Sequence, residues 1–443
     1  AVDIGSTTIA GHLVDLTSGE VLATAGRMNP QIRFGEDLMS RVSYVMMNPG
    51  GDTELTDAVR RALDELTVEL LSETAVPADH VLDVTLVGNP IMHHLVLGFD
   101  PTPLGQAPFP LATERAVRTT AAELDLALDR ASVYVPPCIA GHVGADTAAA
   151  ILNEGPHRSA AVQLLVDVGT NAEIVLGNDD WLFAASSPTG PAFEGAQISC
   201  GQRATVGAVE RVRIDRDTLE PSFRVIGSDL WSSEPGFDDA VASSGVTGVC
   251  GSGIIEVISE LVQSGVIDQQ GSILGAAAAR SPRIVEDART FSYVLYDDLH
   301  ITQADVRAIQ LAKAALRAGI ELLFEHAQID AADDIRLAGA FGAHIDPAHA
   351  MVVGLIPDAP LAAVRAVGNA AGSGAVRTLL SAQQREEIEG LARRVTKIET
   401  ATEPRFQELF VTALAFPHSP ITSTTGEGGR RRRRSRDTRL THE

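Results

Sequence analysis

The 443-residue sequence predicts an α/β fold made of two similar domains that face each other across a cleft. The length corresponds to two or three domains of about 100–200 residues each. A strand that ends in an Asp-x-Gly-Ser/Thr turn occurs twice, and its two aspartates, Asp3 and Asp167, are 164 residues apart. Segments typical of helices and strands follow each copy. A distant repeat of this size indicates two related domains.

The composition is that of a folded, acidic protein, with 45% hydrophobic residues, a net charge of −23 and 3 cysteines. The apolar fraction argues against disorder, and the acidic balance argues against nucleic acid as a partner. No run approaches the roughly 20 uncharged apolar residues of a membrane span, so we expect no membrane association. Cys138, Cys200 and Cys250 are too widely spaced for a disulfide framework or a metal motif, so we expect a cytoplasmic protein.

Each copy of the repeat reads as three strands joined by two turns. In the first copy, VDIGSTT (2–8) precedes an apolar run, the turn LTSG (16–19) and the strand VLAT (21–24). In the second copy, VDVGTN (166–171) precedes IVL (174–176), the turn GND (177–179) and WLFA (181–184). Apolar runs separated by Gly, Asn, Asp and Ser are typical of antiparallel strands. We therefore expect each domain to begin with three such strands.

The elements that follow the repeats are read from apolar periodicity and capping residues. Thr302 and Asp305 form a T-x-x-D capping signature at the start of a long helix. We expect helices at 52–75, 91–97, 144–152, 253–264, 302–326, 374–380 and 383–395, and strands at 82–87, 132–135, 335–337 and 363–367. The predicted domains are 1–152 and 161–416, with a linker at 153–160.

The two ends of the sequence differ in character from the rest of the chain. The sequence begins at Ala1 inside a strand-like run, without an initiator Met, so we expect that an N-terminal portion precedes it. Residues 422–443 contain seven arginines and carry a net charge of +4, which leaves −27 on the rest of the chain. Such a run is typical of a solvated, disordered basic tail, and an anion-binding tail is the alternative.

The repeated turns carry chemistry that suits a nucleotide. Glycine permits a tight turn close to a phosphate, and backbone amides and hydroxyls donate hydrogen bonds to it. Asp3 and Asp167 are hard oxygen ligands for Mg²⁺, directly or through bound water, and we assign them catalytic roles. The expected phosphate contacts are Gly5, Ser6, Thr7, Gly169, Thr170 and Asn171. The alternative is a pair of tight hairpins without a ligand.

Glycine-rich segments later in the chain are candidates for adenosine contact. Gly339, Ala340 and Gly342 follow a short apolar strand, and small residues let a flat ring lie against the backbone. The turn can also open a helix whose N-terminus favours anions, and the alternative is a plain glycine-rich turn from strand to helix. Gly251, Ser252 and Gly253 begin a predicted helix. They either contact the nucleotide or serve only as the start of that helix.

Three carboxylates are further candidates. Glu173 is a candidate catalytic residue that positions water or magnesium, or else an exposed strand carboxylate. Glu194 lies in a Gly/Pro-rich loop, which is a common place for ligand contact, and is a candidate base. Asp146 either helps to hold Mg²⁺ or caps a helix.

The order of these motifs resembles the superfamily of acetate and sugar kinases, Hsp70 and actin. That order is an Asp turn, a connecting helix at 144–152, a second Asp turn, the GAFG segment at 339–342 and a last helix at 374–380. The resemblance implies two ribonuclease-H-like domains that clamp ATP·Mg²⁺ between them. It also implies that Asp3 and Asp167 face each other near the metal and the phosphates.

A narrower resemblance covers nearly the whole chain, from residue 1 to about 416. It is carried by NPQIRFGED (29–37), GNPIMHHL (88–95), GHVGAD (141–146), SPTGPAFEG (187–195), GVCGSG (248–253) and VGNAA (367–371). These segments are similar to those of the reductive activators of corrinoid enzymes. The resemblance implies ATP-dependent reduction of an inactive Co(II) corrinoid protein, or of a corrinoid-dependent methyltransferase, to the Co(I) state. It leaves a homodimer open.

The sequence departs from that family in its cysteines. The family carries an iron–sulfur cluster, and a cluster needs closely grouped thiolates. Cys138, Cys200 and Cys250 form no such group, so this chain lacks ligands for the cluster. We expect either a ferredoxin-like domain before Ala1 or a separate electron donor. A small-molecule kinase and a nucleotide-binding scaffold are the alternative functions.

Overall fold

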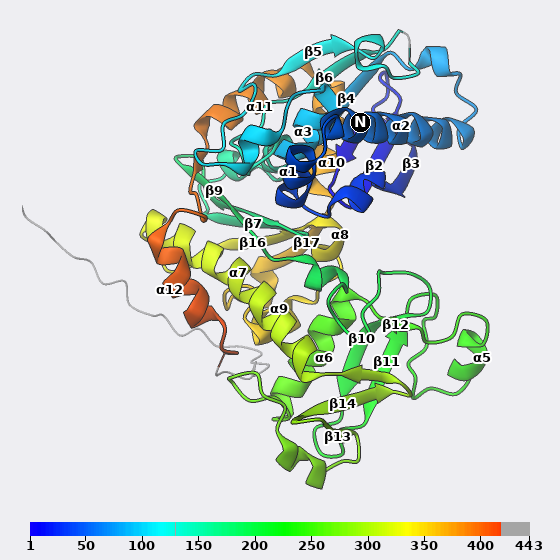
Figure 1. Cartoon of the computed structure of the whole chain (residues 1–443), viewed down its shortest axis with the longest axis vertical. Helices are drawn as coiled ribbons and strands as arrows, with labels where there is room; N and C mark the ends of the chain where they lie inside the picture. The colour runs from blue at the N-terminus through cyan, green and yellow to red at the C-terminus, as the bar shows by residue number, and fades with distance from the viewer. Residues whose placement is uncertain (129, 418–443) are drawn as a thin grey trace, which may run out of the picture.

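The computed structural model describes residues 1–128 and 130–417, and these residues form two six-stranded sheets and two three-stranded sheets (Figure 1). The first six-stranded sheet has the order β3-β2-β1-β4-β6-β5. Its strands are β1 (Val2–Ile4), β2 (Thr8–Val14), β3 (Val21–Met28), β4 (Asp83–Gly88), β5 (Val117–Thr120) and β6 (Ser132–Val135). Strand β1 is antiparallel to β2 and parallel to β4, so it lies at the centre of the sheet.

The second six-stranded sheet repeats this plan, with the order β17-β16-β7-β8-β9-β18. Its strands are β7 (Gln163–Val168), β8 (Ala172–Gly177), β9 (Leu182–Ser187), β16 (Asp334–Ala338), β17 (Val364–Gly368) and β18 (Thr396–Lys397). Strand β7 is antiparallel to β8 and parallel to β16. Each sheet thus has an antiparallel meander and two parallel strands on the other side of its first strand, which is the ribonuclease-H-like order. The predicted fold class is confirmed.

Helices α1 (Leu38–Met47), α2 (Gly51–Ser72) and α3 (Pro90–Leu97) pack with the first sheet into one apolar core. The apolar face of α2 repeats with helical periodicity through Leu55, Val59, Leu63, Leu66 and Leu70, each at most 6% exposed. Burial of this stripe, rather than the intrinsic propensity of the helix, fixes α2 against β2 and β3.

Two helices that are far apart in the sequence join the halves. Helix α4 (Ala145–Glu154) packs closely against α10 (Ala370–Leu380), because Gly374 lies directly on the backbone of Ala149. Helix α11 (Ala382–Arg394) continues along the first sheet, where Arg385 forms an ion pair with Asp83. Residues 370–394, which the predicted boundaries place in the second domain, therefore pack against the first sheet (Figure 1).

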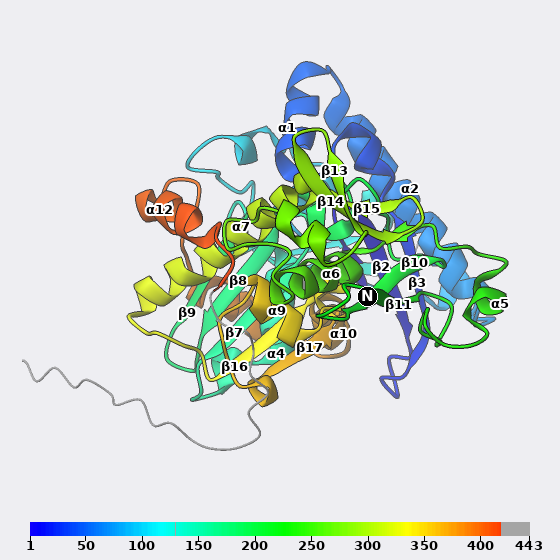
Figure 2. The same ribbon diagram turned by 90° about the horizontal axis from the view of Figure 1, so that it is seen from below.

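A lobe that the sequence reading did not resolve is inserted in the second half. Its strands are β10 (Ala208–Ile214), β11 (Pro221–Val225), β12 (Gly248–Val249), β13 (Ile284–Asp287), β14 (Thr290–Tyr296) and β15 (Leu299–Ile301), with α5 (Phe237–Val241) beside them. Helices α6 (Gly251–Gln263), α7 (Gln303–Ala327), α8 (Gly339–Gly342), α9 (Pro347–Val353) and α12 (Pro404–Ala413) complete this half (Figure 2). The capping box of Thr302 and Asp305 at the start of α7 is confirmed.

In the part of the chain that the structure describes, no helix has the length and apolar character needed to cross a membrane. The predicted basic tail at 422–443 lies outside the described residues. The predicted domain boundaries at 152 and 161 remain a prediction.

Candidate functional site

The two repeated aspartates lie at corresponding places in the two sheets. Asp3 lies on β1 and is paired with Val87 of β4, and Asp167 lies on β7 and is paired with Ala338 of β16. Both side chains are half-buried. After burial and the charge of Asp146, the charge of Asp167 also raises the pKa of Asp3. The two predicted residues therefore lie at corresponding places in the two sheets and within electrostatic range of each other.

Asp146 and Glu173 complete a group of four carboxylates with these aspartates. Burial, followed by the charges of neighbouring carboxylates, raises the pKa of Asp3 to about 8 and that of Asp167 to about 7. Burial raises the pKa of Asp146 to about 6, although the hydrogen bond from the Thr147 amide opposes the shift. The pKa of Glu173 is also raised, first by burial and then by Asp146 and Asp167. The charges of these four acids therefore act on one another, although no three of their carboxylates converge within 4.8 Å of one another.

The first Asp turn is held by side chains from three other segments. Asn29 donates through Nδ2 to the carbonyl of Gly5 at 2.9 Å, and Asn89 donates through Nδ2 to the Ser6 hydroxyl at 2.7 Å. Arg41, which is fully buried, donates to the carbonyl of Ser6 at 2.5 Å. These donors occupy the carbonyls of Gly5 and Ser6 and the Ser6 hydroxyl, and they therefore hold the turn in this conformation.

The second Asp turn is held mainly by the loop that follows β9. The Thr189 hydroxyl donates to the carbonyls of Gly169 and Thr170, both at 2.9 Å, and the amide of Gly190 donates to Thr170 O at 2.9 Å. The Thr170 hydroxyl in turn donates to Glu194 Oε1 at 2.7 Å. The amide of Gly169 is bonded to the carbonyl of Asn171 at 3.1 Å, which closes the turn.

The Gly-Ala-Phe-Gly segment lies directly beside the second turn. Gly339 has φ +85°, and a Cβ there would collide with the Asp167 carboxylate, so only glycine fits. Phe341 stacks on Phe193 with ring centroids 5.4 Å apart and an interplanar angle of 10°. Helix α8 is a single turn, which is shorter than the helix that the sequence reading expected to open here.

Gly251, Ser252 and Gly253 form the first turn of α6, as expected, and all three are buried. Gly251 touches the ring of Phe341, so this helix start lies against the Gly-Ala-Phe-Gly segment. The Ser252 hydroxyl donates to the carbonyl of Glu210 at 3.1 Å, which is a packing contact within the fold. Contact of 251–253 and 339–342 with adenosine remains a prediction.

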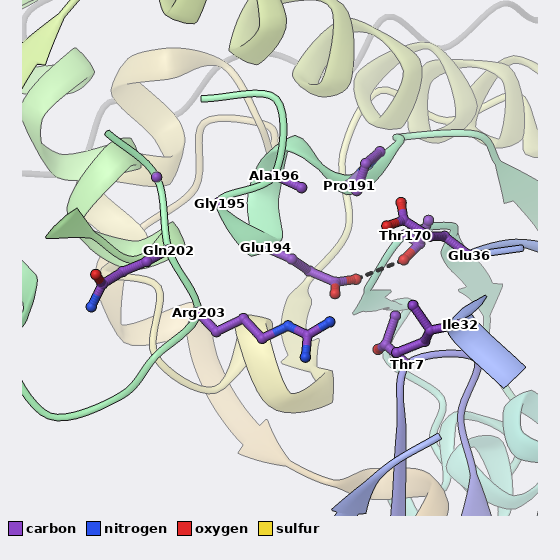
Figure 3. A pocket seen from close by; sticks show the side chains of 11 residues that line it. Thr7, Ile32, Glu36, Thr170, Pro191, Glu194, Gly195, Ala196, Gln202 and Arg203 are labelled. Atoms are coloured by element: carbon purple, nitrogen blue, oxygen red, sulfur yellow. Dashed lines mark hydrogen bonds between the residues drawn. The ribbon is translucent and has the colours of Figure 1, made fainter. Parts of the chain in front are cut away.

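A cavity of about 170 Å³ opens between the two Asp turns (Figure 3). Thr7 lines it from the first turn and Thr170 from the second, and Ile32 and Glu36 line it from the first half. The side chains of Glu194 and Arg203 point into the space beside the two threonines. The lining from the second half consists of Thr170, Pro191, Glu194, Gly195, Ala196, Gly201, Gln202 and Arg203.

Several residues of the site were not assigned a role from the sequence alone. Asn369 forms a side-chain hydrogen bond with Asp3 that lowers the pKa of this acid. Its signal was the segment VGNAA at 367–371, in which the asparagine also caps α10. Glu36 and Arg203 were not singled out because exposed charged residues in loops carry no periodicity. Of the two roles predicted for Asp146, the helix cap is wrong, because Gly144 occupies the N-cap position of α4.

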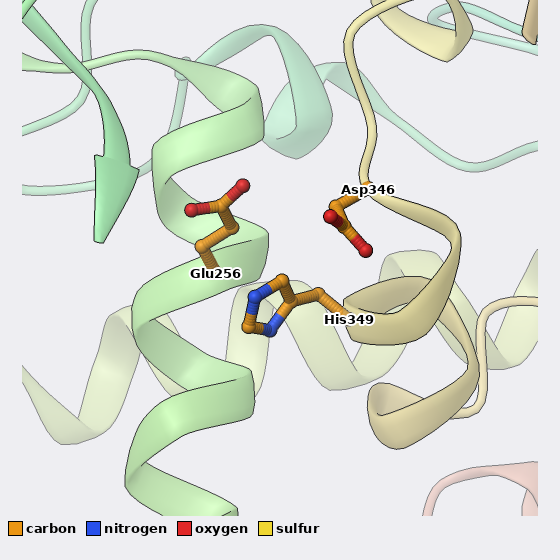
Figure 4. A group of neighbouring side chains, drawn as sticks. All are labelled: Glu256, Asp346 and His349. Carbon is orange, nitrogen blue, oxygen red and sulfur yellow. The ribbon is translucent and has the colours of Figure 1, made fainter. Parts of the chain in front are cut away.

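A second group of candidate metal ligands consists of Glu256 on α6 and of Asp346 and His349 at the start of α9 (Figure 4). Glu256 accepts hydrogen bonds from Arg211 and from the amide of Val212, both at 2.7 Å. Asp346 caps α9. Because Arg211 already neutralises Glu256, this group is explained by the packing of α6 against α9 and β10.

The three cysteines do not form a cluster site. Cys138 and Cys250 are buried, Cys200 is half-buried, and all three are free. Among the described residues, the one group of three or more potential metal ligands within 4.8 Å contains no cysteine. The residues present therefore do not fit an iron–sulfur cluster.

The fold and the site define a class of protein. Two ribonuclease-H-like domains place two Asp turns around a cleft with a carboxylate centre, as in the ASKHA superfamily. Residues 161–425 match the family described as the C-terminal domain of RACo, the ASKHA domain, and residues 1–159 match the RACo middle region. The chain belongs to the RACo family, the reductive activators of corrinoid enzymes.

Individual relatives agree with this assignment. The chain is 34% identical over 432 residues to the corrinoid activation enzyme RamQ of Eubacterium limosum, covering 94% of this chain and 70% of RamQ. It is 24% identical to the [Co(II) methylated amine-specific corrinoid protein] reductase of Methanosarcina barkeri, covering 94% of this chain and 76% of that protein. A solved reductive activator for corrinoid, iron–sulfur protein superposes with a TM-score of 0.83 and 34% identity, covering 94% of this chain and 66% of that one. The chain thus spans about two-thirds to three-quarters of the length of these relatives.

Proposed function

We propose that this chain binds and hydrolyses ATP·Mg²⁺ and thereby supports the one-electron reduction of a Co(II) corrinoid protein to the Co(I) state. The observation that carries the proposal is the cavity lined by Thr7 and Thr170 of the two Asp turns, together with four acids whose charges act on one another. The relatives are named as corrinoid-activating and corrinoid-reducing proteins, which supplies the class of partner. These names favour a corrinoid activator over the small-molecule kinase alternative.

The residues present fit a magnesium ion and a triphosphate. Asp3, Asp167, Asp146 and Glu173 supply hard oxygen ligands, for Mg²⁺ or for its water shell, and the two turns supply amides and hydroxyls for the phosphates. Bound magnesium supplies positive charge that offsets the charge of the phosphates. Arg203 adds a positive side chain at the cavity. The roles of Gly339 and its neighbours at the adenosine are part of this proposal.

The connection between the halves supports a coupling role. Helices α4 and α10 are in close contact through Gly374 and Ala149, and the first turn of α4 carries Asp146, one of the four carboxylates. A nucleotide that touches both Asp turns favours the closed arrangement of the halves by its contacts on both sides. Reduction of Co(II) from ordinary donors is uphill, so we propose that closure changes the contact with the corrinoid protein.

The electron that reduces Co(II) comes from a donor other than residues 1–443. Because the cysteines do not fit a cluster, we assign no electron-transfer step to residues 1–443. A ferredoxin-type donor, as a further domain or a separate protein, is the proposed source. The proposal concerns the nucleotide-using part alone and leaves the quaternary structure as an open prediction of a homodimer.

The test follows the absorption spectrum of the cobalt in a corrinoid protein from the same genome, mixed with this protein, ATP·Mg²⁺ and titanium(III) citrate. We expect Co(I) to accumulate faster with ATP·Mg²⁺ than without it. Asp3→Asn and Asp167→Asn are expected to abolish the gain, whereas Asp180→Asn, an exposed carboxylate after β8, is the matched control. Equal Co(I) with and without nucleotide for every corrinoid protein of that genome contradicts the proposal.

A further inference from the structure

The cavity between the Asp turns contains a carboxylate that the assignment of magnesium and phosphate ligands does not use. Glu194 Oε1 accepts a hydrogen bond from the Thr170 hydroxyl at 2.7 Å (Figure 3). The carboxylates assigned to magnesium are Asp3, Asp146, Asp167 and Glu173, and none of these four lines the cavity. Glu194 lies instead with the threonines that line the cavity.

The position of Glu194 is fixed by contacts of the neighbouring residues in its loop. Phe193, which precedes it, is fully buried and stacks on Phe341. Thr189 and Gly190, earlier in the same loop, form hydrogen bonds with the backbone of the second Asp turn. The loop and the turn therefore form one unit, and Glu194 keeps its place relative to a phosphate bound at that turn.

We propose that Glu194 is the catalytic base of ATP hydrolysis, an inference that rests on the proposed ATPase function. A phosphate bound between Thr7 and Thr170 presents its terminal phosphorus to the cavity, where a water molecule has room beside the Glu194 carboxylate. The water oxygen forms a bond to the γ-phosphorus, and the bond from this phosphorus to the β–γ bridging oxygen breaks. ADP leaves with that electron pair, and the proton of the water passes to Glu194 and then to solvent.

Other carboxylates suit this role less well. Glu173 accepts a hydrogen bond from Ser186 at 3.2 Å and belongs to the central acid group. Glu36 also lines the cavity, but its side chain is exposed. Thr170 acts as a positioning residue in this scheme, because its hydroxyl holds the carboxylate that receives the proton.

The experiment measures ATP hydrolysis and ATP·Mg²⁺ binding separately. For Glu194→Gln we expect hydrolysis to fall by about 10²–10⁴-fold, the usual contribution of a general base, while the Kd for ATP·Mg²⁺ stays within about threefold. Glu286→Gln, a change at an exposed residue of β13, is the matched control and keeps the rate of the natural protein. Hydrolysis by Glu194→Gln within threefold of the natural rate, with binding retained, overturns the inference and leaves the proposed function standing.

A second pair of variants addresses the risk that Glu194→Gln disturbs the fold. Thr170→Val removes the hydroxyl that orients Glu194, and we expect kcat to fall about tenfold, whereas Thr170→Ser keeps the hydroxyl and restores the rate. If Thr170→Ser is as impaired as Thr170→Val, or if Glu36→Gln rather than Glu194→Gln abolishes hydrolysis, Glu194 is not the base. If the natural protein binds no ATP·Mg²⁺, the proposed function fails, and this inference fails with it.

Discussion

The two Asp turns have nearly the same sequence but are supported in different ways. Amide and guanidinium side chains, from Asn29, Asn89 and Arg41, hold the first turn. A loop that carries Glu194 holds the second, and its hydrogen bonds run to backbone carbonyls and to the Thr170 hydroxyl. The two copies thus share the turn itself, while the side chains that surround it differ.

This difference suggests different duties for the two turns. The donors around the first turn fix its carbonyls and its hydroxyl. This arrangement suits a turn that only binds the nucleotide and takes no part in its hydrolysis, which we call the cradle role. The second turn is connected through Phe193 and Phe341 to the Gly-Ala-Phe-Gly segment, and through Glu194 to the cavity. We therefore expect changes at the first turn to act mainly on nucleotide binding, and changes at the second to act on turnover as well.

The largest effect is expected from removal of charge at the carboxylate centre. Asp167→Asn and Asp3→Asn each remove an anionic oxygen close to the proposed magnesium, and we expect ATP hydrolysis to fall by at least about 10²-fold. The comparison predicts that Asp167→Asn lowers kcat more than Asp3→Asn does. A phosphate-release assay measures both rates, with Asp180→Asn as the control, and natural rates in both variants contradict the assignment.

A somewhat smaller effect is expected at Gly339. Alanine there meets the Asp167 carboxylate and must adopt a left-handed φ, so we expect Gly339→Ala to lower the free energy of unfolding by about 1–3 kcal/mol. The displaced Asp167 also weakens ATP·Mg²⁺ binding, by about tenfold. Calorimetry measures both quantities. Gly50→Ala is the matched control for strain alone, because its φ is +82° and a Cβ there meets no atom within 4 Å.

The acid group predicts a dependence of stability on pH. The folded-state pKa values of Asp3, Asp167 and Asp146, about 8, 7 and 6, lie above the ordinary aspartate pKa of 3.8, so the folded chain binds more protons than the unfolded chain between about pH 4 and 8. The stability of the nucleotide-free protein is therefore highest at the acidic end of this window and falls as the pH rises to about 8. Asp3→Asn is expected to reduce this loss and to add about 1–3 kcal/mol at pH 8.

Chemical denaturation at several pH values checks this dependence. Mg²⁺ with nucleotide is expected to flatten the profile, because bound cation stabilises the ionised carboxylates. Stability of the nucleotide-free protein that rises from pH 5 to 8, or an Asp3→Asn profile that coincides with that of Asp180→Asn, would refute the interpretation of the four acids as a cation site.

Much of the fold was predictable from the sequence, since the repeated turns and apolar periodicity specify the central strands and the long helices. The strands around 208–301 were not, because their short apolar runs carry no repeat and their partners are distant in sequence. The same limit applies to the site. Asp3 and Asp167 are marked by a local motif, whereas Asn369 and Arg203 become site residues only when the chain brings distant loops together.

The smallest predicted effect tests the cradle role of the first turn. Asn89→Ser keeps a side chain that caps α3 but is too short to donate to the Ser6 hydroxyl, so one hydrogen bond to the turn is lost. One such bond contributes about 0.5–1.5 kcal/mol, so we expect the Kd for ATP·Mg²⁺ to rise about 2–12-fold while kcat is unchanged. Asn48→Ser removes a comparable bond, from Asn48 Nδ2 to the carbonyl of Tyr44 in α1, and serves as the control. A fall in kcat as large as that of Thr170→Val would show that both turns take part in turnover, and the distinction between cradle and catalytic turn would have to be abandoned.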